Sequence, residues 1–244
     1  EAFRPTYPHT LFSAILSYAP MNEEKRALEI GIGTGQATPP ILETGCRVEA
    51  VELSPSMAEY VRKKFAGNSR FSVSLSSFEA YEGEEESFGL IYAATSFHWI
   101  PEAVGYPKAF HLLKKGGALA LFWNRPYAAR KSDPLHREIQ KLYAKYRPDS
   151  RKLQEEYEGE RYRKFQENME RYGFTDTEFH LFHRTREFTA DAYISLLDTY
   201  SDHRAMDPDK KRDFYREMQN VILKHGNCMR VYDTMDLYLG RKPA

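Results

Sequence analysis

The sequence predicts an α/β fold, a doubly wound sheet with a terminal antiparallel hairpin and an inserted helical cap. Three observations lead to this prediction. Nearly continuous apolar runs alternate with helix-length segments in the first half of the chain. The pattern then becomes helical and strongly charged after Pro126, and two strand-like runs follow late in the chain. Strands that alternate with helices imply right-handed crossovers and helices on both faces of one sheet.

Four apolar runs locate the strands of the first half, because such runs are typical of strands buried on both faces. They are Ala27–Ile30, Arg47–Leu53, Phe88–Ala94 and Gly117–Trp123. Ser54 followed by Pro55 is a helix N-cap with proline at the first helical position, so a helix should cover Ser56–Phe65. A second helix should cover Ala103–Leu113, where basic residues and two glycines end it.

The middle of the chain predicts helices rather than strands. Ser132, Asp133 and Pro134 should cap a helix that runs to about Tyr146. The heavily charged stretch 149–171 should form further helices, either as a solvated face or as a lid over a site. The predicted division of the chain is therefore 1–125 as the main part of the core, 126–172 as the inserted cap and 173–244 as the C-terminal part of the core.

The last part of the chain predicts two edge strands with helices between them. Thr175–Phe188 and Arg230–Leu239 alternate well enough to form strands. Thr189–Tyr200 and Asp207–His225 should be helices, the second of which ends at a Gly-Asn pair. The two strands should form the antiparallel hairpin at one edge of the sheet.

Composition excludes several classes of protein. The 244 residues include 35 basic and 35 acidic side chains, so no overall field attracts nucleic acid or an anionic membrane. No segment approaches the ~18 consecutive apolar residues of a membrane span, and the first thirty residues lack a signal-peptide pattern. Two cysteines, Cys46 and Cys228, are too few for a disulfide framework, and no metal-ligand cluster is apparent. These features predict a cytoplasmic protein with no metal site and no nucleic-acid or membrane partner.

The strongest local signal is a glycine-rich turn, Gly31-Ile32-Gly33-Thr34-Gly35, after the first strand. Glycines permit positive φ and a close approach of a ligand to the backbone, and the following helix presents free N–H groups. Gln36 stands where a phosphate-binding loop or a dinucleotide fingerprint needs another residue, so both motifs fail. Glu52, at the end of the second strand, can accept hydrogen bonds from both hydroxyls of a ribose.

At these residues the chain resembles the class I S-adenosylmethionine-dependent methyltransferases. Residues 29–35 look like their first motif, 51–54 like the second, 76–79 like the third, 89–94 like the fourth strand and 112–119 like the turn into the fifth. The resemblance spans about Arg4 to Trp123 and implies a Rossmann-like, seven-stranded sheet. Residues 4–8, 96–99 and 199–204 are similar to a small-molecule branch that includes methyltransferase type 11 and trans-aconitate methyltransferase-like proteins.

The resemblance implies S-adenosyl-L-methionine as the cofactor and S-adenosyl-L-homocysteine as the product. The glycine-loop amides suit the cofactor's carboxylate, Glu29 suits its ammonium group and Glu52 its ribose. The expected cofactor-binding residues are Arg4, Tyr7, Glu29, Gly31, Gly33, Gly35, Glu52, Leu53, Met57, Ser77, Phe78, Ala94 and His98.

Methyl transfer from a sulfonium is an in-line displacement with a neutral leaving group, so catalysis can consist mostly of positioning and desolvation. A base is needed only where the acceptor must lose a proton. The expected catalytic residues are Tyr7, near the cofactor's amino-acid end, and His98, at the rim of the sheet after the fourth strand. His98 could act as a base or as a hydrogen-bond donor.

The acceptor pocket should come from the N-terminal arm, residues 126–172 and residues 195–206. Trp99 should provide an apolar wall, Tyr200 and His203 polar contacts, and Arg204 a bidentate fork for a carboxylate. Four residues after the fifth strand could line the same space: Trp123, Asn124, Arg125 and Tyr127.

These residues predict a methyltransferase that acts on a small molecule, with a carboxylate as the expected acceptor, and that is a monomer or a homodimer. Two alternatives stay open. The chain could bind S-adenosylmethionine without catalysis, or it could methylate a protein or a nucleic acid.

Overall fold

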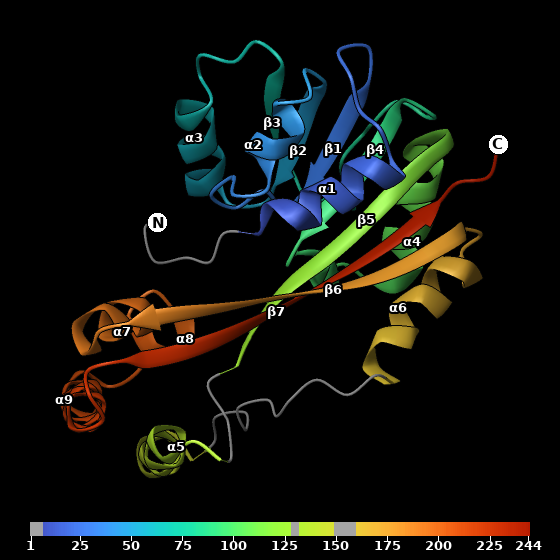
Figure 1. Ribbon diagram of the computed structural model, residues 1–244. Coiled ribbons are helices and arrows are strands. Elements are labelled where there is room, and N and C mark those ends of the chain that lie inside the picture. Colours follow the sequence, from blue (N-terminus) through green and yellow to red (C-terminus); the bar gives the residue numbers. More distant parts are fainter. Residues whose placement is uncertain (1–6, 128–131, 149–159) are drawn as a thin grey trace. The chain divides into compact units, whose positions relative to one another are not determined.

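The computed structural model describes residues 7–127, 132–148 and 160–244 (Figure 1). Within these ranges seven strands form one sheet in the order β3-β2-β1-β4-β5-β7-β6. The strands are β1 (Arg26–Ile30), β2 (Arg47–Glu52), β3 (Phe71–Leu75), β4 (Phe88–Ala94), β5 (Leu113–Tyr127), β6 (Thr175–Phe188) and β7 (Met229–Arg241). The helices are α1 (His9–Tyr18), α2 (Thr38–Leu42), α3 (Pro55–Lys64), η1 (Phe97–Trp99, 3-10), α4 (Glu102–Leu112), α5 (Pro134–Tyr146), α6 (Glu160–Arg171), α7 (Ala190–Leu197), α8 (Ser201–Arg204) and α9 (Pro208–Lys224).

The first five strands are parallel. β1 pairs with β2 and β4, β2 pairs with β3, and β4 pairs with β5. In this register Glu29 lies between Ala50 and Tyr92. Because the carboxyl ends of parallel strands meet at one edge of a sheet, the glycine-rich turn and Glu52 lie at the same edge, where α/β sheets bind ligands.

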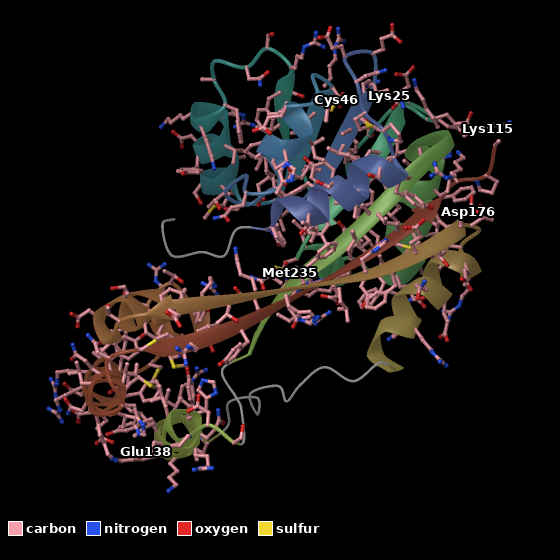
Figure 2. The ribbon with its side chains drawn as sticks, in the orientation of Figure 1. Lys25, Cys46, Lys115, Glu138, Asp176 and Met235 are labelled. Atoms are coloured by element: carbon pink, nitrogen blue, oxygen red, sulfur yellow. The ribbon has the colours of Figure 1, made fainter. Side chains whose placement is uncertain are left out.

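Helices cover both faces of this parallel part, as expected for a doubly wound sheet. On one face, Leu11 and Ile15 of α1 and Ile41 of α2 join a buried apolar cluster with Phe122 of β5 and Met235 of β7. Figure 2 labels Met235 on β7.

On the other face, Phe165 of α6 packs against Trp123 of β5, and Tyr106 of α4 stacks on Tyr172, which follows α6. Figure 1 shows α1 in front of the sheet and α4 behind β5. The strands at the C-terminal end of the sheet are antiparallel, which confirms the predicted fold class.

Contacts between residues divide the chain into two compact units. The described residues of the larger unit are 7–124, 160–182 and 235–244, and those of the smaller unit are 125–127, 132–148 and 183–234. Strands β5, β6 and β7 therefore contribute residues to both units. The smaller unit has its own apolar core, in which α5, α7 and α9 contribute side chains such as Ile139, Leu196 and Phe214.

This grouping differs from the predicted division at residues 125 and 172. The segment 126–172 does not form one body, because α5 belongs to the smaller unit and α6 to the larger. The reason is packing: Phe165 of α6 lies against Trp123 of β5, with ring centroids 4.5 Å apart, whereas α5 packs on α9. The boundaries 1–125, 126–172 and 173–244 stay a prediction.

Local capping signals agree with the structure at several helix starts. Asp133 accepts a hydrogen bond from the Leu135 amide at 2.9 Å, and Asp207 accepts one from the Lys210 amide at 3.0 Å. Ser54 occupies the N-cap position of α3, but its side chain does not bond to the helix backbone. Within the described ranges, no helix combines the length and the apolar character needed to cross a bilayer.

Candidate functional site

A hollow of about 320 Å³ lies at the carboxyl edge of the parallel strands, within the larger unit. The residues that line it come from the ends of β1 and β2 and from the segments after β1, β2, β3 and β4. They are Ile30, Gly31, Val51, Glu52, Leu53, Ser76, Ser77, Phe78, Glu79, Thr95, Ser96, Trp99 and Ile100. Two of the thirteen are acidic and none is basic. This lining suits a cationic ligand and offers no side-chain charge to a phosphate.

The glycine turn after β1 packs against the segment that follows β4, the neighbouring strand in the sheet. Gly31 has φ +69°, and a Cβ added there would lie 2.6 Å from the Cβ of Ser96. Ser96 in turn donates a hydrogen bond to the Ile30 carbonyl, which holds the end of β4 against the end of β1. Gly33 has φ +56°, and an added Cβ would meet nothing within 4 Å. The protein therefore leaves no room for a side chain at Gly31, whereas the space beside Gly33 is unoccupied by protein atoms.

Glu52 is held in place by the backbone around it. It is 9% exposed, its Oε2 accepts the Gly33 amide at 2.9 Å, and its Oε1 accepts the Ser54 amide at 2.8 Å. A carboxylate oxygen can accept a second hydrogen bond. Each oxygen can therefore accept a hydroxyl of a ribose without leaving its backbone partner, so the geometry fits an adenosyl group.

Glu29 is a buried carboxyl in the first motif. It is 1% exposed, and its Oε2 accepts the hydroxyl of Thr38 at 2.7 Å and that of Tyr92 at 2.8 Å. Burial raises the pKa of Glu29 to about 7, although both hydroxyl bonds act to lower it. A cation that binds near this carboxyl would favour its ionised form.

Tyr7 is held at the same edge of the sheet. Its hydroxyl lies 2.8 Å from Oγ1 of Thr95, and its ring packs edge-on against Phe122 with centroids 4.8 Å apart. Burial raises the pKa of Tyr7 to about 12, so the phenol keeps its proton at neutral pH. Thr95 itself has φ +58°, an uncommon conformation for a residue with a Cβ.

Asn124 is a buried amide beside this pair. Its backbone N–H donates to Oγ1 of Thr95 at 3.3 Å. Its side-chain oxygen and nitrogen are both buried and have no hydrogen-bond partner among the described residues. A buried polar group without a partner costs about 1–3 kcal/mol, so this carboxamide is a candidate ligand contact.

His98 lies in η1, the short helix that follows β4. Its side chain is exposed, and its ring centroid lies 5.0 Å from that of Trp99. The indole N–H of Trp123, at the end of β5, donates to Nδ1 of His98 at 3.0 Å. Trp99 is 81% exposed and lines the hollow, whereas Trp123 is 4% exposed.

The structure brings together some of the expected residues and separates others. Those that line the hollow are Gly31, Glu52, Leu53, Ser77, Phe78 and Trp99. Those that are described but do not line it are Tyr7, Glu29, Gly33, Gly35, Met57, Ala94 and His98. Arg4 lies outside the described residues. The individual roles of all these residues stay predictions.

The expected acceptor cluster does not form a polar patch in the smaller unit. His203 is 2% exposed, lies 3.3 Å from the Tyr143 hydroxyl and 3.4 Å from the Tyr215 hydroxyl, and packs against Phe214. Burial lowers the pKa of His203 to about 4, so its ring is neutral at physiological pH. His203 is therefore a core residue, whereas the side chain of its neighbour Arg204 is exposed.

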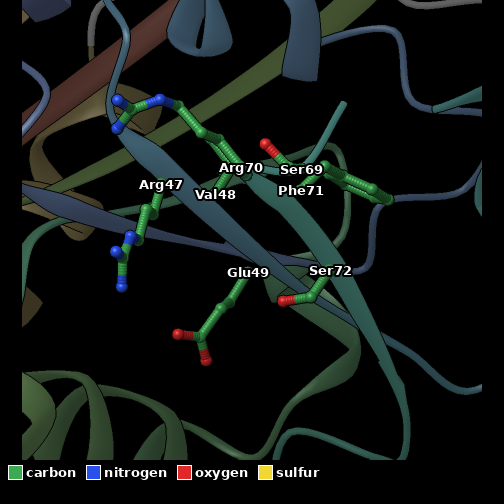
Figure 3. Close-up of a pocket in the computed structure, with 7 residues that line it drawn as sticks. All are labelled: Arg47, Val48, Glu49, Ser69, Arg70, Phe71 and Ser72. Carbon is green, nitrogen blue, oxygen red and sulfur yellow. The ribbon is translucent and has the colours of Figure 1, made fainter. Parts of the chain in front are cut away.

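A second hollow of about 410 Å³ lies at the opposite, amino-terminal ends of β2 and β3 (Figure 3). Its lining residues are Arg47, Val48, Glu49, Ser69, Arg70, Phe71 and Ser72. Figure 3 shows the side chains of Arg70 and Glu49 pointing apart. Arg70 donates to the Glu23 carbonyl at 3.1 Å, and Glu49 forms an ion pair with Arg26 at 2.6 Å. These charges are satisfied within the protein, so we place the candidate site at the carboxyl edge.

Several residues of the site were not identified from the sequence. Thr38 and Tyr92 bond to Glu29, Thr95 bonds to Tyr7, and Ser96 ties β4 to β1. Each of these contacts joins residues that are distant along the chain or lie in different elements. Two signals were available in the sequence. Thr95 and Ser96 follow directly after a predicted strand, and Tyr92 and Ser96 fall in segments that resemble the methyltransferases.

Comparison with known proteins agrees with this geometry. A family described as "Methyltransferase domain" matches residues 27–117, which include the glycine turn and Glu52. An uncharacterized methyltransferase-like protein of Schizosaccharomyces pombe is 26% identical over 251 residues, which cover 100% of this chain and 93% of that protein. The trans-aconitate 2-methyltransferase of Rhizobium etli is 26% identical over 110 residues, which cover 44% of this chain and 41% of that protein.

Solved structures share the fold. A putative type II methyltransferase from Anaeromyxobacter dehalogenans has a TM-score of 0.70 and 19% identity, with 98% of both chains covered. Phosphoethanolamine N-methyltransferase 2 of Haemonchus contortus, solved with S-adenosylhomocysteine, has a TM-score of 0.56 and 16% identity, with 96% of this chain and 52% of that chain covered. The matched methyltransferase domain, the relatives that are named as methyltransferases and the shared fold together support a class I S-adenosylmethionine-dependent methyltransferase.

Proposed function

We propose that this methyltransferase acts on a small molecule. We further propose that the accepting group has already lost its proton at neutral pH, as a carboxylate has. The observation that carries the proposal is the buried Asn124 carboxamide beside the Tyr7–Thr95 pair, whose oxygen and nitrogen have no hydrogen-bond partner among the described residues. The Tyr7 phenol keeps its proton at neutral pH and therefore supplies no base to an acceptor. A carboxylate needs no such base, because it is already ionised.

The polar groups near Tyr7 support the same kind of acceptor. The Asn124 carboxamide offers a donor and an acceptor that have no partner among the described residues. Its nitrogen would donate to an oxygen of the acceptor molecule. Arg204 is exposed in the smaller unit and is not among the residues that line the hollow.

The comparisons and the charge balance support a small acceptor. Part of the chain is similar to a trans-aconitate 2-methyltransferase, whose name describes a small carboxylic acid as its substrate. Equal numbers of acidic and basic residues give no general attraction to a nucleic acid. We expect the active species to be a monomer or a homodimer.

The contacts of the site residues support the roles that we propose for them. S-adenosylmethionine supplies an electrophilic methyl group on its sulfonium when it is bound. We propose that Glu52 holds the ribose while the Gly33 and Ser54 amides keep its carboxylate oriented. Glu29 would balance the ammonium group, and Leu53 and Phe78 would give apolar walls. These residues orient and desolvate the reactants, which can account for much of the rate enhancement.

The test is a screen with methyl-labelled S-adenosylmethionine and separate panels of small carboxylic acids, amines and phenols, with bulk RNA and protein as further arms. We expect label in a carboxylic acid, as an ester that releases labelled methanol in alkali. The Glu52→Ala variant is the control for transfer through this site and should transfer little label. Label found only in an amine, a phenol or a macromolecule would reject the proposed acceptor class.

A further inference from the structure

We propose that Trp123 is a positioning residue that holds His98 in a single tautomer, so that His98 serves as a hydrogen-bond donor to an oxygen of the acceptor and not as a base. This inference rests on the proposed function, because it assigns the contact between His98 and the acceptor. It starts from one contact, the 3.0 Å hydrogen bond from the Trp123 indole nitrogen to Nδ1 of His98.

The direction of this hydrogen bond is set by chemistry. An indole N–H can only donate, so Nδ1 of His98 must supply a lone pair. A neutral imidazole has one protonated and one unprotonated nitrogen. With Nδ1 as the acceptor, the proton is on Nε2, and Nε2 can then donate but cannot accept.

Trp123 is well placed to impose this state, because its own position is determined by packing. The side chain is 4% exposed, and its ring lies 4.5 Å from the ring of Phe165 and 5.8 Å from that of Tyr238. Phe165 and Tyr238 also contact each other, with centroids 4.8 Å apart. A buried indole in such a cluster has little freedom to turn its N–H away.

His98, by contrast, is an exposed side chain on a short helix. Such a side chain would ordinarily sample several rotamers and both tautomers. The hydrogen bond from Trp123 restricts the ring and fixes the proton of the neutral imidazole on Nε2. Since Phe97 is buried against Tyr106 with centroids 5.0 Å apart, the backbone that carries His98 is also held in place.

The functional consequence concerns the acceptor. If His98 took a second proton at Nδ1, two N–H groups would face each other and the bond from Trp123 would be lost. The contact therefore opposes the imidazolium form, which a general base must reach. A donor at Nε2 suits an oxygen that carries lone pairs, such as that of a carboxylate or a carbonyl.

The first experiment uses the full chain without cofactor or acceptor. Long-range nitrogen–proton correlation spectra distinguish the two neutral tautomers and the imidazolium, and the missing signal in His98→Gln assigns His98 among the eight histidines. We expect wild-type His98 to show the Nε2–H tautomer. The Nδ1–H tautomer or the imidazolium at neutral pH would overturn the proposal, and this result does not depend on knowing the acceptor.

The second experiment tests the role of Trp123. Trp123→Phe keeps an aromatic ring against Phe165 but removes the N–H, so a mixture of His98 tautomers should appear. The matched control is Trp99→Phe, the same change at the chain's other tryptophan, which should leave the tautomer as in wild type. An unchanged tautomer in Trp123→Phe would show that Trp123 does not position His98. If that variant does not fold, the wild-type spectrum still decides the tautomer.

A third experiment separates a donor from a base once an acceptor is found. The Gln side-chain nitrogen can donate from near the position of Nε2 but cannot accept a proton. His98→Gln should therefore retain more of the wild-type kcat/KM than His98→Leu, which should lose about threefold to tenfold, mainly through KM. Equal and large losses of kcat in both variants would identify His98 as a base. Failure of the acceptor screen would leave the tautomer result unchanged, so the two proposals fail separately.

Discussion

The substitution Glu29→Gln tests whether the buried carboxyl of the first motif destabilises the folded chain at neutral pH. Glu29 has a pKa of about 7 in the folded protein, against an ordinary value of 4.5. Below pH 4.5 the carboxyl is protonated in both states. As the pH rises towards 7, the unfolded chain loses this proton first, so the group's stabilising contribution is lost through that range.

The magnitude follows from the size of the shift. A rise of the pKa from 4.5 to about 7 corresponds to roughly 3 kcal/mol in the free energy of unfolding, and most of this change develops between pH 5 and pH 8. Gln has nearly the same shape, and its carbonyl oxygen can accept the hydroxyls of both Thr38 and Tyr92. The free energy of unfolding of the variant, relative to that of wild type, should therefore be about 2–3 kcal/mol higher at pH 8 than at pH 5.

The assay is urea unfolding of both proteins at the two pH values, without cofactor, with the free energy extrapolated to water. Glu24→Gln, at an exposed position, is the matched control and should not reproduce the gain. If Glu29→Gln is no more stable relative to wild type at pH 8 than at pH 5, then burial does not hold the proton on Glu29. The account of this carboxyl would then be wrong.

Three further predictions concern the same edge of the sheet. Glu52→Ala should weaken S-adenosylmethionine binding by ~1–3 kcal/mol in calorimetric titration, because charge-assisted hydrogen bonds are lost, and an unchanged affinity would mean that the ribose lies elsewhere. Gly33→Val should fold, with a loss of about 1–2 kcal/mol in the free energy of unfolding because φ is +56°, but it should lose cofactor binding. Gly31→Ala should lose more stability, because its Cβ would lie 2.6 Å from the Cβ of Ser96. Equal stability of the two variants would contradict the geometry of the turn. Asn124→Leu should raise the free energy of unfolding by about 1–3 kcal/mol, because it removes two buried polar atoms without partners, and a loss of stability would show that those atoms are satisfied.

Features that depend on near neighbours in the chain could be predicted well. Asp133 and Asp207 were expected to begin helices, and each accepts the amide that an N-cap should accept. β3 was not located, since Phe71–Leu75 is an edge strand with alternating exposed serines and lacks the continuous apolar run of its neighbours. An edge strand needs only one buried face, so its apolar signal is weaker.

Features that depend on distant residues could not be predicted in the same way. His203 follows a helix and has polar neighbours in sequence, yet three aromatic rings from α5 and α9 enclose it. The bond from Trp123 of β5 to His98 joins that strand to η1, which follows the adjacent strand β4, and spacing along the chain does not specify it. The glycine turn and Glu52 were recognised because they form a motif, but the amides that orient Glu52 became apparent only in the fold.

The contrast between the two tryptophans also gives the protein an optical property. Trp99 is 81% exposed on the wall of the hollow, and Trp123 is 4% exposed in an aromatic cluster. The emission of an indole moves to shorter wavelength when water is removed from around it. The chain thus carries one reporter of ligand occupancy and one internal reference, so binding can be followed by fluorescence without any attached dye.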